Sequence, residues 1–142
     1  MDADIALIVA LDGDRLHLVE QHRPVVGGRR WEFPSGDVEP LVDSDTAATA
    51  TRELREETGL RAASLTRLGT LDIMPSTLDQ RCAVFLAAGL TEGAPDRDPG
   101  ERDMRSAWFA RSEVEQMIAD GTICDAKTLA AYALLAVHGP AG

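Results

Sequence analysis

The segment between Ser44 and Leu60 constrains the fold more than any other part of this sequence, because it has the features of a helix with a defined start and end. Its body, residues 47–58, contains no glycine or proline, and Gly59 follows where a left-handed residue commonly ends a helix. Three residues of good N-cap type come first: Ser44, Asp45 and Thr46. We therefore predict a helix here, capped at both ends.

Three glutamates lie on one face of this predicted helix. Glu53, Glu56 and Glu57 are spaced at i, i+3 and i+4, which brings their carboxylates together. Like charges at this spacing repel, raise one another's pKa values and, near a helix C-terminus, oppose the helix dipole. A divalent cation would relieve the repulsion, and an oxygen-only set suits Mg²⁺ or Mn²⁺ better than Zn²⁺. The spacing equally fits a solvated acidic face, with Arg52 and Arg55 as salt-bridge partners.

The rest of the chain alternates predicted strands with predicted helices. Strands are expected at residues 5–11, 16–19, 31–34, 65–73, 81–90 and 107–109, and further helices from Ser112 to Ala119 and from Asp125 to Ala136, with Ser112 and Asp125 as N-caps. Residues 12–14 have the turn chemistry of a hairpin, and a second turn is expected at Pro34–Gly36. The pattern predicts one α/β domain over residues 1–142, with a mixed sheet packed between helices.

Charge and hydropathy argue against several classes of protein. The 14 basic and 24 acidic side chains give a net charge of −10, a poor match to nucleic acids, whose binding depends on Lys and Arg. No run approaches the roughly 18 consecutive apolar residues of a membrane span, and the N-terminus lacks the basic region of a signal peptide. Cys82 and Cys124 are expected to be free, buried thiols. We therefore expect a cytoplasmic protein without a membrane or nucleic-acid partner.

Read together with Gly36, the helix segment resembles the signature of a known family. Gly36 followed by Arg52-Glu-Leu-Arg-Glu-Glu-Thr-Gly-Leu60 is similar to the Nudix box, and it matches the second half of that motif at every defined position. Three other segments resemble the ADP-ribose pyrophosphatase branch of the Nudix hydrolases: residues 20–24, 31–36 and 121–129. The resemblance implies a Nudix-like α/β/α sandwich and a pyrophosphohydrolase.

The first half of the motif departs from the family pattern, which places a glutamate between the glycine and the arginine to brace the arginine. Counting forward from Gly36 by the family's spacing reaches Val42, and counting back from Arg52 reaches Ser44. The interval is therefore two residues too long and no glutamate fills the position. We expect Asp43 or Asp45 to substitute for it in space.

The resemblance also implies a divalent metal ion, Mg²⁺ or Mn²⁺, which would neutralise a diphosphate and activate water. Glu53 and Glu57 are the expected principal ligands, with Glu56 sharing in the binding. The backbone carbonyl of Ser35 is a further expected ligand. Arg52 is expected to orient the carboxylates through salt bridges.

Hydrolysis needs a base to deprotonate water, and in this branch the base is usually a carboxylate on the loop before the last strand. That loop contains Glu101, the first candidate, and Asp103, the second.

Expected substrate contacts precede the Nudix box. Arg23, Arg29 and Arg30 have guanidinium groups suited to forked contacts with phosphate, and the resemblance favours Arg23. Trp31 either belongs to the core or stacks on a base. Glu32 either lies near the substrate or forms a salt bridge.

The branch resemblance implies a substrate such as ADP-ribose or a related nucleoside diphosphate sugar, cleaved to a nucleoside monophosphate and a sugar phosphate. A nucleoside triphosphate-sanitising pyrophosphatase is an alternative, although Ser35-Gly36-Asp37 departs from the Gly-Gly-Lys usual there. A non-catalytic ligand-sensing module is another. The family implies a homodimer, and because the first predicted strand begins at Ile5, we expect no additional N-terminal sheet.

Overall fold

The computed structural model describes residues 2–138; Met1 and residues 139–142 of the predicted domain lie outside the described residues. The strands are β1 (Ile5–Asp12), β2 (Arg15–Arg23), β3 (Gly28–Glu32), β4 (Ser35–Asp37), β5 (Arg61–Asp72), β6 (Arg81–Thr91) and β7 (Arg105–Ala110). The helices are α1 (Thr46–Thr58), α2 (Arg111–Ala119) and α3 (Ala126–His138), and a short 3₁₀ helix, η1, spans Pro99–Glu101. The predicted alternation of strands and helices is confirmed.

β1 lies inside the sheet and is buried on both faces. It pairs in parallel with β6 along one edge, and its side chains alternate between two hydrophobic cores. Leu7 and Val9 belong to the core on one face, whereas Ala6 and Ile8 belong to the core on the other. A strand covered on both faces needs apolar side chains on both, which explains the uninterrupted apolar run.

The other edge of β1 is shared by two strands that diverge from it. β4 pairs with Ile5–Leu7, whereas β2 pairs with Ala10–Asp12. The turn predicted at Pro34–Gly36 is therefore wrong, because Ser35 and Gly36 belong to β4. Pairing with the unsatisfied backbone groups of the β1 edge outweighs the turn tendency of this segment. The candidate site described below lies where β2 and β4 separate.

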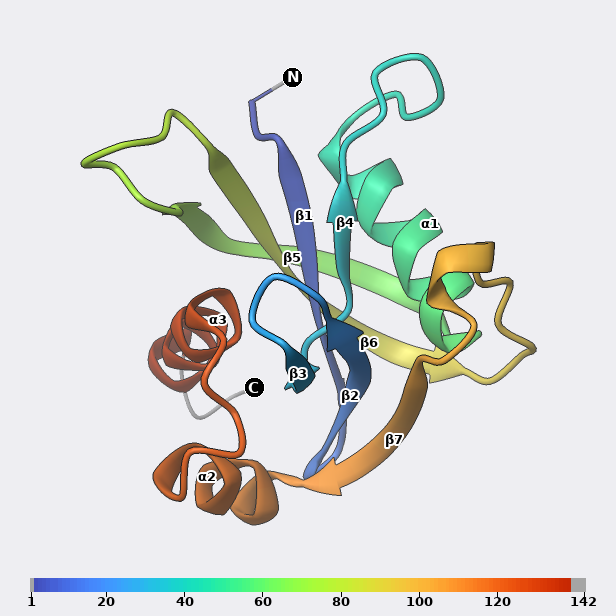
Figure 1. Ribbon diagram of the computed structural model, residues 1–142. Coiled ribbons are helices and arrows are strands. Elements are labelled where there is room, and N and C mark those ends of the chain that lie inside the picture. The colour runs from blue at the N-terminus through green and yellow to red at the C-terminus, as the bar shows by residue number, and fades with distance from the viewer. Residues whose placement is uncertain (1, 139–142) are drawn as a thin grey trace.

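The helices cover both faces of the mixed sheet. Ala50 and Leu54 of α1 pack into one core, and Val114 of α2 and Ala131 of α3 pack into the other. Figure 1 shows α1 on one face of the sheet, with α2 and α3 on the opposite face. The predicted α/β/α class is confirmed.

The predicted ends of α1 are confirmed, but the predicted start of α2 is wrong. Asp45 caps α1 by accepting a 2.8 Å hydrogen bond from the backbone N–H of Ala48, and Gly59 ends the helix with φ of 79°. Ser112 does not cap α2, because the helix begins at Arg111. Instead, the backbone N–H of Ala110 donates a 2.8 Å hydrogen bond to the carboxylate of Glu113. A side chain within the first turn of α2 therefore caps the N-terminus of the helix.

The sequence also made predictions about the thiols and about membrane spans. Both cysteines are free, and Cys82 is buried as expected. Cys124 is exposed, contrary to expectation, because it lies in the loop that leads into α3. No helix within residues 2–138 has both the length and the apolarity needed to cross a bilayer.

Candidate active site

Two glutamates of α1 are buried, which is unusual for carboxylates. Glu53 is 8% exposed and Glu57 is 1% exposed. The buried positions of α1 recur at helical spacing, and both glutamates are among them because they lie one turn apart. α1 packs against β1 and β4, so these carboxylates are enclosed between the helix and the sheet.

β4 lies directly against the buried carboxylates. The backbone N–H of Ser35 donates a 3.3 Å hydrogen bond to Oε1 of Glu57. A Cβ atom added at Gly36 would lie 2.1 Å from Cδ of Glu53, so no residue larger than glycine fits without displacing that carboxylate. The glycine before the helix therefore has a steric reason, which is the close approach of the β4 backbone to Glu53.

Glu53 has one arginine partner, Arg52, whereas Glu57 has no ion-pair partner among the described residues. Burial raises the pKa of Glu53 to about 7, although the Arg52 guanidinium lies nearby. Burial, reinforced by the carboxylates of Glu53 and Glu101, raises the pKa of Glu57 well above its usual value. The pKa of Glu101 is also raised, chiefly by burial. A cation would complete the charge balance of this cluster.

Asp43 takes the bracing position for which the sequence offered two candidates. Its carboxylate accepts hydrogen bonds from Nε and Nη2 of Arg52, at 3.0 and 2.9 Å. It also accepts from the Thr49 hydroxyl and from the backbone N–H of Glu39. The Arg52 guanidinium holds the pKa of Asp43 well below its usual range. Asp45, the other candidate, is occupied as the N-cap of α1.

Arg52 contacts the acidic face of α1 as well as Asp43. Its Nη1 donates to the Glu53 carboxylate at 2.9 Å and to Oε2 of Glu56 at 3.4 Å. Glu56 also lies 3.8 Å from Arg55. The third predicted ligand is therefore held by arginines, whereas Glu57 receives only the Ser35 backbone N–H among these contacts.

The residues present fit a divalent cation in their chemistry. The predicted ligands offer only oxygen atoms, the donor type of Mg²⁺ and Mn²⁺ sites. The Gly36 backbone lies directly against the carboxylate of Glu53, and Glu57 is buried with no ion-pair partner among residues 2–138. Within residues 2–138, no three or more Asp, Glu, His or Cys side chains are already placed to hold a metal ion. Binding through all three glutamates would require Glu56 to release Arg52.

A cavity of about 400 Å³ opens beside the cluster, where β2 and β4 diverge. Glu53 and Glu101 both line it, together with Arg23 and Lys127. The segment that leads to η1 is attached to the end of α1, because the backbone N–H of Asp96 donates to the Glu56 carbonyl at 2.9 Å. This contact accounts for the position of η1 next to α1 in Figure 1.

The two candidate bases differ in position. Glu101 lines the cavity that Glu53 also lines. Asp103 does not line it and instead forms an exposed ion pair with Arg29, 3.1 Å from Nη1. Arg29 in turn pairs with Glu20, so it links the loop that follows η1 to β2.

The predicted substrate contacts lie beside this cavity and a second one. Arg23 lines both cavities, and its Nε and Nη2 atoms donate to the two oxygens of Glu32 at 2.8 and 2.7 Å. Glu32 therefore forms the salt bridge that was one of its two predicted roles. Arg30 lines the second cavity. Trp31 packs against the core, edge-on to Phe109 with ring centroids 5.0 Å apart, which supports its core role.

The geometry can now be compared with known proteins. The family model of the NUDIX domain matches residues 1–132. The chain belongs to the Nudix family. Nudix hydrolases generally use divalent metal ions, in agreement with the oxygen donors around Gly36.

Two curated relatives cover most of this Nudix chain. An ADP-ribose pyrophosphatase of Mycobacterium tuberculosis is 35% identical over 94% of this chain and 64% of its own length. A CMP-5'-(N-acetyl-N-hydroxy-3-aminopropyl)phosphonate hydrolase of Streptomyces rubellomurinus is 33% identical over 96% of this chain and 65% of its own length. The chain thus spans a little under two thirds of these relatives.

A solved structure of an ADP compounds hydrolase has the same fold. Its TM-score is 0.82 with 22% sequence identity, and the match covers 95% of this chain and 71% of that one. At this identity the likeness establishes the Nudix fold.

Proposed function

We propose that this chain hydrolyses the diphosphate linkage of ADP-ribose or a related nucleoside diphosphate sugar, giving a nucleoside monophosphate and a sugar phosphate. The observation that carries the proposal is the pair Glu53 and Glu57, two buried carboxyl groups with raised pKa values, of which Glu53 lies against Gly36 and lines the cavity. Two of the curated relatives are named ADP-ribose pyrophosphatase, from Mycobacterium tuberculosis and Bacillus subtilis. Both support this substrate class.

Mg²⁺ or Mn²⁺ is the proposed cofactor, held by Glu53, Glu57 and Glu56 and by the backbone carbonyl of Ser35. The ion would supply positive charge to the diphosphate and lower the pKa of water. Arg52 orients the glutamates from one side, because Asp43 fixes its guanidinium. These residues would hold the cofactor once Glu56 releases Arg52.

Glu101 is the proposed general base. It takes a proton from water as the water oxygen forms a bond to phosphorus, and the bridging P–O bond breaks with its electrons passing to the departing phosphate. The raised pKa of Glu101, caused chiefly by burial, makes it a stronger base than an exposed glutamate. Arg23, which lines both cavities, and Arg30, which lines the second, would contact the substrate phosphates.

Trp31 and Glu32 support the substrate contacts in this proposal without touching the reacting atoms. Glu32 is 3% exposed and holds Arg23 through two hydrogen bonds, so it fixes the direction of that guanidinium. Trp31 anchors β3 in the core.

A product panel tests the proposed reaction. We would incubate the protein with ADP-ribose, other nucleoside diphosphate sugars, dinucleotides and nucleoside triphosphates, with Mg²⁺ or Mn²⁺ and with a chelator. Metal-dependent AMP from ADP-ribose is expected. Pyrophosphate released from triphosphates would support the sanitising alternative, and ligand binding without any product would support the sensing module.

Glu101→Gln tests the base. Loss of a general base lowers turnover by about 10²–10⁴-fold. Asp103→Asn is the matched control, and because its ion pair is exposed we expect a change below about fivefold. A large loss in Asp103→Asn with near-normal turnover in Glu101→Gln would transfer the role to Asp103.

A homodimer in the cytoplasm is the proposed setting of this activity. The family resemblance supports the dimer, and the net charge of −10 supports a small-molecule substrate over a nucleic acid. Sedimentation velocity at micromolar protein concentration tests the assembly, and a single monomeric species would contradict it.

A further inference from the structure

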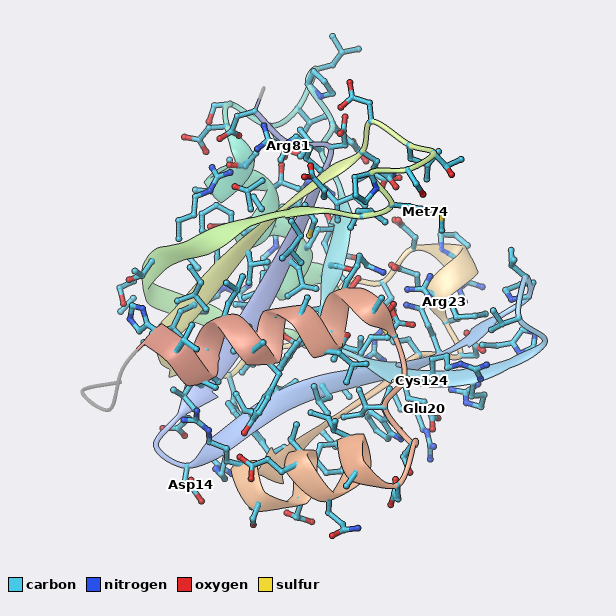
Figure 2. The ribbon with its side chains drawn as sticks, turned by 90° about the vertical axis from the view of Figure 1, so that its left-hand side faces the viewer. Asp14, Glu20, Arg23, Met74, Arg81 and Cys124 are labelled. Atoms are coloured by element: carbon cyan, nitrogen blue, oxygen red, sulfur yellow. The ribbon has the colours of Figure 1, made fainter. Side chains whose placement is uncertain are left out.

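The second cavity adjoins the first and shares two cationic side chains with it. Its volume is about 370 Å³, and it lies between the β2–β3 hairpin and the start of α3. Arg23 and Lys127 line both cavities. Figure 2 shows Arg23 beside the loop that carries Cys124 into α3.

These two cations stand out against an acidic surface. The other ionisable side chains that line the first cavity are Asp37, Glu39, Glu53, Asp98 and Glu101. A substrate anion is therefore repelled over most of that wall and attracted at the boundary between the cavities. Arg23 is already neutralised by the two-oxygen contact with Glu32. Lys127 has a single contact of this kind, 3.1 Å from Oδ1 of Asp125.

The position of Lys127 is coupled to the strand that carries the predicted metal site. Asp125 uses its second oxygen to accept hydrogen bonds from the Thr128 backbone N–H and hydroxyl, at 3.1 and 2.8 Å. The Thr128 hydroxyl oxygen in turn accepts a 3.2 Å hydrogen bond from the backbone N–H of Phe33, two residues before β4 begins at Ser35. This chain of contacts fixes the start of α3, and with it Lys127, relative to Ser35.

We propose that Nζ of Lys127 binds a non-bridging phosphate oxygen of the substrate at the boundary of the two cavities. The diphosphate then spans this boundary, with one phosphate beside Glu53 and the organic group of the other in the second cavity. Val25 and Val26, both exposed, offer that group an apolar edge of the second cavity. The assignment rests on the proposed hydrolysis of a nucleoside diphosphate sugar. It makes Lys127 a substrate-contacting residue rather than only an ion-pair partner of Asp125.

Chemical labelling tests this directly, because Lys127 is the only lysine in the chain. The protein is treated with an acetylating reagent with and without saturating AMP, ribose 5-phosphate or inorganic pyrophosphate, in the presence of Mg²⁺. Peptide mass spectrometry follows acetylation at residue 127, and a lysine peptide added to the same tube controls for reagent consumption. At least one of the three probes is expected to slow acetylation of Lys127 about tenfold. Equal rates with and without all three overturn the proposal.

Variants separate substrate contact from a structural role. Lys127→Gln is expected to raise KM about tenfold, the effect of losing one charge-assisted contact, with kcat and the thermal midpoint little changed. Lys127→Arg should restore most of the affinity. Arg15→Gln removes one positive charge from an exposed ion pair with Asp12 that lines neither cavity, and it should leave KM unchanged.

The outcomes distinguish this inference from the function on which it rests. A KM within twofold of wild type in Lys127→Gln, with normal hydrolysis, overturns the role of Lys127 and leaves the proposed function standing. Absence of hydrolysis in the wild type overturns the proposed function. In that case the labelling experiment still tests Lys127, because slower acetylation with pyrophosphate or AMP would show a phosphate contact without any hydrolysis.

Discussion

Asp43 and Glu57 are buried carboxylates around the same helix, with 4% and 1% of their surfaces exposed, yet their pKa values shift in opposite directions. Asp43 accepts hydrogen bonds from Arg52, Thr49 and the Glu39 backbone, and its pKa is lowered. Glu57 accepts only from the Ser35 backbone among the contacts described above, and its pKa is raised.

The difference separates a structural acid from a binding acid. A buried carboxylate with a full set of donors is stable as an anion, and removing it leaves those donors without their acceptor. A buried carboxylate without a cation is destabilising until one arrives. Asp43 holds Arg52 in place beside α1, and we propose that Glu57 binds a cation.

Glu57→Gln tests this difference between the two acids, and we expect it to have the largest effect on activity. We expect metal-dependent hydrolysis to fall by at least about 100-fold, beyond the loss typical of residues that only orient metal ligands. The free energy of unfolding without metal should stay equal or rise, because a neutral amide is easier to bury than an unpaired carboxylate. Turnover assays and urea unfolding measure both. Unchanged turnover, or a marked loss of stability, would show that Glu57 is a structural acid.

Asp43→Asn should produce the opposite pattern. Breaking this buried ion pair weakens the contacts that Nε and Nη2 of Arg52 make with the Asp43 carboxylate, so the free energy of unfolding should fall by about 3 kcal/mol. Asp45→Asn is the matched control, because Asn caps helices as well as Asp does, and its effect should stay below about 0.5 kcal/mol. Equal effects in the two variants would mean that Asp43 does not brace Arg52.

His17 provides a third case, a buried titratable side chain whose ring nitrogens form no hydrogen bond within the described residues. It is 7% exposed, and the ring lies edge-on to Trp108. Burial lowers its pKa from 6.5 to about 4, with smaller opposing or supporting contributions from Glu92, Arg15 and Arg97.

The pH dependence of stability follows from this shift. Below pH 6.5, His17 is protonated in the unfolded chain, whereas in the folded protein it stays neutral down to about pH 4. The stability of the fold therefore falls as the pH falls through this window. Between pH 6.5 and pH 4, the free energy of unfolding of the wild type should fall by about 2 kcal/mol more than that of His17→Phe. This figure is smaller than the complete pKa shift would give, because His17 is partly accessible to solvent. Urea unfolding at both ends of the window measures it. Parallel losses in the two proteins would contradict the assigned burial.

Local patterns in the sequence predicted most of the fold and the acidic cluster. α1, its two caps and the hairpin between β1 and β2 follow from residue types at neighbouring positions. β4 was missed because Ser35 and Gly36 have turn chemistry, and only pairing with β1, distant in sequence, makes them a strand. The start of α2 was missed because Glu113 supplies the cap from inside the helix.

The parts of the site that depend on distant contacts were less predictable. The spacing of the motif narrowed the candidates for the residue that braces Arg52 to Asp43 and Asp45. The conformation of the loop between β4 and α1 brings Asp43 to Arg52, and the sequence does not reveal that conformation. The choice between Glu101 and Asp103 likewise depends on Arg29, which contacts Asp103 across 74 positions of sequence. Lys127 had no signal of function apart from its place in a segment that resembles the family.

The central claim is that the buried carboxylate of Glu57 binds a divalent cation. Thermal unfolding with and without such an ion tests this claim most directly. Mg²⁺ or Mn²⁺ at about a hundredfold excess over its Kd stabilises a folded protein by about 2.7 kcal/mol, which raises the thermal midpoint by several degrees. We predict this rise in the wild type and its loss in Glu57→Gln. An equal rise in both proteins, or none in the wild type, would contradict the account.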